Sequence, residues 1–188
     1  MILTEEKREE RKITVQEFFE MELEEGYFYE LINGHIVKKQ APSPAHQKAV
    51  TNLSTFINNY IKEKQLGDCY VAPIDVFFDK FNNTQPDILF IKTDRLFIVS
   101  NDGIMGHPDL IVEVLSPSTY RNDRSVKKDL YCEFGVSEYW IVDPKNQAIE
   151  VYTLEDNVYV LSSFAIEIGE IESKVLQGFT MDIIAVFA

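Results

Sequence analysis

Cysteine is scarce in this chain of 188 residues, which contains only Cys69 and Cys132. Neither belongs to a CxxC pair, and no histidine pattern accompanies them, so a zinc site is not indicated. We expect two reduced, partly buried thiols.

Long apolar runs are also missing. No segment approaches the roughly 18 consecutive apolar residues that a membrane span requires. The N-terminal segment lacks the apolar stretch behind a basic start that marks a secretory signal. We therefore expect a cytoplasmic protein with no membrane partner.

Basic residues are few: 18 Lys and Arg stand against 31 Asp and Glu, for a formal net charge of −13. Phosphate binding usually shows itself as basic excess, so this balance argues against a nucleic-acid partner. The deficit is uneven, however, because residues 31–144 hold 14 acidic and 12 basic side chains. Four basic residues of that stretch lie close together at positions 121–128. They form either a local basic patch or a solvated helix face, and they are Arg121, Arg124, Lys127 and Lys128.

Repeats, low-complexity tracts and Pro/Gly/Ser linkers are absent from the sequence, and the 45% hydrophobic and 26% charged content is typical of globular proteins. We expect one domain over residues 1–188, in which residues 1–12 form a flexible or helical extension.

The local patterns alternate between helix and strand. Thr14 and Glu17 form a capping-box signature for a helix running to about Glu25. The Asn33-Gly34 dipeptide predicts a hairpin over residues 27–39, and apolar spacings of three and four predict a helix over 45–64. Further strands are expected at 69–79, 86–92, 96–100, 109–115, 138–143, 148–154 and 158–164, with a helix at 123–134 and a strand or short helix at 179–187. The pattern favours a mixed α/β domain.

Two carboxylates occupy strand positions that would otherwise be apolar, Asp87 in "PDILFIK" and Glu113 in "DLIVEVL". From adjacent strands they could hold one hard cation such as Mg²⁺. Two simpler explanations stay open: Asp87 caps the turn after Pro86, and Glu113 pairs with a buried Lys or Arg. Lys127 on the following helix adds a mobile ammonium, and the three together suit phosphodiester hydrolysis.

Longer motifs carry a family resemblance. "YELINGHIV", "SPAHQ", "PDILFI", "HPDLIVEVLSPST", "DRSVKKDLY" and "GVSEYWIVDP" resemble, in order and spacing, the Uma-two family of restriction endonucleases. The resemblance runs from about Ile13 to the C-terminus. It implies a restriction-endonuclease-like fold of the PD-(D/E)xK superfamily, a central mixed β-sheet flanked by helices, here with an N-terminal helix and hairpin.

The resemblance also assigns residues. It implies metal binding by Asp87, Glu113 and the backbone carbonyl of Val114. The lysine of the superfamily would fall at Leu115, and the family supplies it from the next helix, where Lys127 fits.

Other positions match the family less directly. Glu30 is either an additional metal ligand or a cross-strand salt-bridge partner. His46 either contacts phosphate or caps its helix. Arg124 and Lys128 are candidates for substrate binding, and Lys128 also competes with Lys127 for the catalytic position. Asp109 lies about 13 Å along the strand from Glu113, too far to share a metal with it.

The primary hypothesis is an endonuclease that hydrolyses DNA with Mg²⁺, for which Mn²⁺ would substitute, and that acts as a homodimer. Asp87, Glu113 and Lys127 would be catalytic. The rival is a catalytically silent nuclease-fold protein that binds or regulates, as part of a mobile-element or defence system. A third candidate, a hydrolase of small phosphate esters, would use the same residues in a closed pocket.

Overall fold

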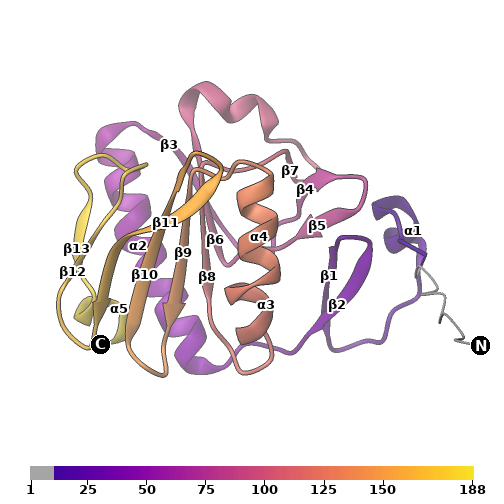
Figure 1. Cartoon of the computed structure of the whole chain (residues 1–188), viewed down its shortest axis with the longest axis horizontal. Coiled ribbons are helices and arrows are strands. Elements are labelled where there is room, and N and C mark those ends of the chain that lie inside the picture. The colour runs from indigo at the N-terminus through magenta and orange to yellow at the C-terminus, as the bar shows by residue number, and fades with distance from the viewer. Residues whose placement is uncertain (1–10) are drawn as a thin grey trace, which may run out of the picture.

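The central layer is a six-stranded mixed sheet of order β11-β10-β9-β8-β6-β3 (Figure 1). The computed structural model describes residues 11–188, so most of the expected N-terminal extension lies outside the described residues. Only β8 and β9 run parallel within this sheet. The strands are β3 (Gly67–Val71), β6 (Ile88–Lys92), β8 (Leu110–Val114), β9 (Glu138–Asp143), β10 (Ala148–Glu155) and β11 (Val158–Ile166).

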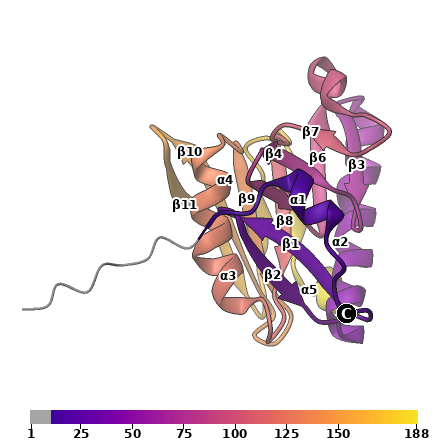
Figure 2. The ribbon, with the colours of Figure 1, turned by 90° about the vertical axis from the view of Figure 1, so that its right-hand side faces the viewer.

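Helices cover both faces of this sheet, because successive side chains of its central strands point to opposite faces and are apolar on each. Helix α2 (Pro44–Lys64) packs on one face and α4 (Val126–Glu133) on the other, as Figures 1 and 2 show. On the α2 face lie Phe90, Val112 and Trp140, and on the α4 face lie Leu89, Ile111 and Tyr139. The mixed sheet flanked by helices confirms the predicted fold class.

Helix α2 forms where the periodicity predicts it. Ser43 caps its start, since the Ser43 hydroxyl accepts the His46 N–H at 3.2 Å, and Pro44 occupies the first turn. The helix ends at Gln65, whose φ of 56° is left-handed. The apolar stripe then faces the sheet through Val50, Leu53, Ile57 and Ile61.

A second sheet, of order β2-β1-β5-β4-β7, lies beside the first on the α4 side. Its strands are β1 (Phe28–Ile32), β2 (His35–Lys39), β4 (Val76–Asp79), β5 (Asn82–Thr84) and β7 (Ile104–Met105). Asn33 and Gly34, both with positive φ, make the predicted turn between β1 and β2. This hairpin carries Glu30, which is fully buried, and Lys39, which is half-buried.

The remaining elements refine the expected boundaries. Helix α1 (Val15–Glu20) begins with the predicted Thr14–Glu17 capping box but ends five residues earlier than expected. The predicted helix over 123–134 is interrupted at Ser125, which separates α3 (Tyr120–Arg124) from α4. The C-terminal segment contains β12 (Glu170–Glu172), β13 (Thr180–Asp182) and α5 (Ile184–Phe187).

The strand predicted at residues 96–100 is wrong, because most of that segment belongs to the 3-10 helix η1 (Thr93–Ile98). The buried carboxylate of Asp109 holds the start of η1: it accepts the Lys92 N–H at 3.0 Å and pairs with Arg95 at 3.1 Å. Phe97 is 82% exposed, so the apolar letters of this segment do not reflect strand burial.

Both cysteines are half-buried and unpaired, and burial raises the pKa of the Cys69 thiol to about 12. Among the helices of residues 11–188, none combines the length and apolar content that a membrane crossing needs.

Glu138 anchors the C-terminal segment to β9. Its Oε1 accepts the Trp140 Nε1–H at 2.7 Å and the Ser173 hydroxyl at 2.6 Å. Its Oε2 accepts the backbone N–H groups of Lys174 at 2.6 Å and Val175 at 3.1 Å. Both oxygens of one buried carboxylate are therefore used as acceptors.

Replacing Glu138 by Gln should lower the free energy of unfolding by about 2 kcal/mol, because the amide NH₂ group would then face donors. Urea unfolding of Glu138→Gln and of the exposed control Glu155→Gln measures this difference. Equal midpoints for the two variants would show that the carboxylate does not anchor the segment.

Candidate active site

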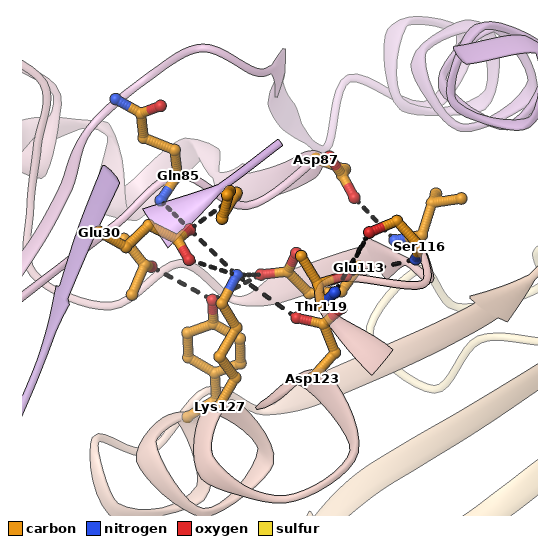
Figure 3. A network of polar contacts seen from close by, with 12 residues as sticks. Glu30, Gln85, Asp87, Glu113, Ser116, Thr119, Asp123 and Lys127 are labelled. Atoms are coloured by element: carbon orange, nitrogen blue, oxygen red, sulfur yellow. Dashed lines mark hydrogen bonds and ion pairs between the residues drawn. The ribbon is translucent and has the colours of Figure 1, made fainter. Parts of the chain in front are cut away.

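Glu113 lies in β8 and points to the face that α4 covers. Ile111 and Leu115, two residues away on either side, share that face and are apolar. The Glu113 side chain is buried and enters the gap between the sheet, α4 and the β1–β2 hairpin (Figure 3). A carboxylate in such a position requires polar partners.

Lys127 is the first of these partners. It reaches inward from α4, and its Nζ lies 2.8 Å from Glu113 Oε1, 2.9 Å from Glu30 Oε2 and 3.6 Å from Asp123 Oδ1. The side chain is only 1% exposed. Glu113 thus pairs with a buried lysine, which is the simpler explanation that the sequence left open, and Lys127 is enclosed by carboxylates and is not the mobile ammonium that the sequence suggested.

Tyr131, one helical turn after Lys127, is the second partner. Its hydroxyl donates to Glu113 Oε1 at 2.7 Å and lies 3.2 Å from the Thr84 hydroxyl of β5. Tyr131 was not among the predicted site residues. Its i+4 spacing from Lys127 is the signal that both side chains share a helix face.

Glu30 connects the hairpin to this cluster. It is fully buried, and besides Lys127 its Oε1 accepts Lys39 Nζ at 3.0 Å and the Gln85 N–H at 2.9 Å. The expected cross-strand salt bridge therefore exists, and it is joined to the Glu113 site. The sequence did not reveal Lys39, which lies on the same face of the hairpin as Glu30.

Asp87, just before β6, approaches the end of β8. Its Oδ2 accepts the Val114 N–H at 2.7 Å and lies 3.2 Å from His46 Nε2 at the start of α2. The second ring nitrogen of His46, Nδ1, is buried without a hydrogen-bond partner among the described residues. Asp87 thus links the start of α2 to the strand that carries Glu113.

Acidic groups outnumber basic ones in this cluster, and burial shifts the pKa values of the carboxyl groups. Burial, together with the nearby carboxylates of Asp123, Asp87 and Glu30, raises the pKa of Glu113 to about 8 against the opposing effect of Lys127. Burial also raises the pKa of Asp123. For Glu30 burial acts in the same direction, but Lys127 and Lys39 outweigh it and lower the pKa.

A cavity of about 120 Å³ opens beside these carboxylates. Asp87, Glu113, Val114 and His46 line one part of it, and Lys39 reaches it from the hairpin. In residues 11–188, no protein group bonds to Asp87 Oδ1 or to Glu113 Oε2. Each carboxylate is held through one oxygen, and the other is available to a ligand.

Arg124 and Lys128, predicted to bind substrate, lie elsewhere. Arg124 Nη2 pairs with Glu150 Oε1 at 2.7 Å, and Lys128 Nζ lies 3.3 Å from the centroid of the Tyr152 ring. Neither lines the cavity. Lys127, and not Lys128, occupies the position beside Glu113.

The fold is restriction-endonuclease-like. Over 93% of this chain and 97% of the other, the structure matches a crystal structure described as "a putative nuclease belonging to DUF820" from Anabaena variabilis, with a TM-score of 0.73 and 21% sequence identity. That likeness shows a shared fold.

The chain belongs to the Uma2 family, described as "Putative restriction endonuclease", whose model matches residues 15–184. The family assignment that the sequence motifs suggested is confirmed. Two uncharacterized proteins of Synechocystis sp. are also similar. The protein slr1290 is 28% identical over 78% of this chain and 76% of its own length, and sll1609 is 25% identical over 85% and 92%.

Lys127→Met should destabilise the fold by about 3–5 kcal/mol, because it leaves the Glu30 carboxylate buried without one of its two ammonium partners. Lys128→Met is the matched control on the next residue of the same helix and should cost less than about 1 kcal/mol. Chemical unfolding of both variants measures the difference. A stable Lys127→Met protein would show that the cluster tolerates loss of its central cation.

Proposed function

We propose that this protein is a nuclease that hydrolyses DNA phosphodiester bonds with Mg²⁺, or with Mn²⁺ as a substitute. One observation carries the proposal: Asp87 and Glu113 line the same cavity, and each keeps one oxygen free of partners among the residues that the structure describes. Membership of the Uma2 family supports the same reaction class. The homodimer and the cytoplasmic location remain predictions.

The donor set fits a small hard cation. Within residues 11–188, no group of three or more His, Cys, Asp or Glu side chains is arranged to hold a metal. Mg²⁺ does not need such a group, because it takes one or two carboxylates and keeps several waters. Asp87 and Glu113 would supply the carboxylates.

Val114 would supply a third oxygen. In an extended strand the N–H and C=O of one residue point to the same side. The Val114 N–H points to Asp87, so its carbonyl faces the same side, and Val114 also lines the cavity. A metal bound there would lower the pKa of a bound water and neutralise charge that develops on the phosphate.

The protein's own groups would share the remaining work. Lys127 and Tyr131 fix Glu113 through Oε1, which sets the direction of the other oxygen. Because Lys127 is enclosed, we assign it to holding Glu113 and balancing charge. Lys39 pairs with Glu30, has 15% of its side chain exposed and lines the cavity, so we assign it to contacting a phosphate oxygen.

Asp87→Asn should lower DNA cleavage by about 100-fold or more, since it removes a charged ligand while its amide oxygen still accepts the Val114 N–H. Plasmid and single-stranded DNA with Mg²⁺ or Mn²⁺ serve as substrates, and exposed Asp94→Asn is the control. Calorimetric titration with Mn²⁺ should show weakened binding in Asp87→Asn alone. Unchanged cleavage would remove Asp87 from the mechanism, and absence of both cleavage and metal binding in the wild type would favour the catalytically silent alternative.

Lys39→Met should lower kcat/KM by about 10- to 100-fold, because a charge-assisted contact to phosphate is lost. Lys38→Met provides a matched control. Lys38 is the preceding residue of β2, points to the opposite face and pairs with Glu24 and the Tyr27 ring. Circular dichroism checks that both variants fold. Equal activity of the two variants would exclude Lys39 from substrate binding.

A further inference from the structure

Most basic side chains of residues 121–128, the candidate patch for nucleic-acid binding, contact other parts of the protein. Lys127 is buried among carboxylates, Arg124 is paired with Glu150, and Lys128 lies on the Tyr152 ring. Proteins that grip duplex DNA often make about 6–10 phosphate contacts with Lys and Arg. Three of the four basic residues in segment 121–128 have internal partners, and the net charge is −13. Few cations of this segment are therefore left to contact the phosphates of a long duplex.

The cavity itself has the features of a site for a single base. Phe28 and Val71 are 44% and 42% exposed, yet both line it, next to the carboxylate pair. Three polar residues, Gln40, Gln47 and Gln85, line it as well. Unpaired bases are typically held by stacking on an aromatic ring and by polar groups that reach their edges.

The hairpin places an aromatic ring and a cation side by side. Phe28 and Lys39 are direct cross-strand partners, so their side chains lie on the same face, and both reach the cavity. A nucleotide needs this combination, because its base presents a flat apolar face and its phosphate a negative charge. The neighbouring pair, Tyr29 and Lys38, lies on the opposite face of the hairpin.

We propose that the cavity accepts one unpaired nucleotide, its base against Phe28 and its phosphate toward Lys39, and that the protein therefore acts on single-stranded DNA through a short footprint. This inference rests on the proposed nuclease function. In a duplex the same base is stacked and paired, and extracting it costs free energy that a single strand does not require.

The test compares one 30-nucleotide strand, the same strand as a blunt duplex, and a hexanucleotide cut from it, all with Mn²⁺. The single strand should be cleaved with a kcat/KM about 10- to 100-fold above that of the duplex. The hexanucleotide should fall within about tenfold of the long strand. The logarithm of affinity for the single strand should fall with the logarithm of salt concentration with a slope of about −1, as one or two phosphate contacts give.

Phe28→Ala should lower kcat/KM on the single strand by about tenfold through KM, and Phe28→Trp should restore it, because stacking tolerates either ring. A merely structural role of Phe28 would not give this rescue. Phe97→Ala, at another exposed phenylalanine that does not line the cavity, is the control and should leave cleavage unchanged.

Equal cleavage of strand and duplex, or a salt slope of about −5 or steeper, would overturn the inference. Fluorescence anisotropy in Ca²⁺ measures the same preference as binding, without cleavage. If no substrate is cleaved, the nuclease proposal fails, while tighter binding of the single strand would still support the nucleotide site and equal binding would reject it.

Discussion

One buried cluster of three charged groups holds the candidate site together: the Lys127 ammonium lies between the carboxylates of Glu30 and Glu113. These residues belong to the hairpin, the central sheet and the crossover helix, and the two carboxylates are 83 residues apart in sequence. An ammonium that is almost fully buried requires its partners, and each carboxylate requires the ammonium. The position of the second sheet relative to the first is therefore coupled to the charge balance of the site.

The same cluster also fixes the geometry of the cavity beside it. Because Lys127 and Tyr131 bind one oxygen of Glu113, and the Val114 N–H binds one oxygen of Asp87, both carboxylates have fixed orientations before any ligand arrives. Sites that are ordered in advance lose less free energy when they bind. The second oxygen of each carboxylate and the Lys39 ammonium give the cavity opposite charges on neighbouring walls.

Much of the fold and several site residues could be predicted from the sequence, because most of the sequence patterns that indicate them are local. The capping box, the Asn33-Gly34 turn and the apolar stripe of α2 depend on residues within one or two turns of each other, and they form as expected. Asp87, Glu113 and Lys127 stood out by breaking an apolar pattern or by matching family motifs. Lys39 was missed because its place depends on cross-strand register and on how the hairpin docks, neither of which a local pattern encodes. Residues 96–100 were mistaken for a strand because an apolar residue type does not show whether its side chain is buried or exposed.

The parallel pairing of β8 with β9 has a consequence for where the lysine can reside. Parallel neighbours cannot be joined by a tight turn, so the chain must leave the sheet and return across one of its faces. Residues 115–137 make that return over the face to which Glu113 points, and Lys127 lies within them. The strand position at Leu115 and the crossover helix thus offer two routes for a cation to the same carboxylate.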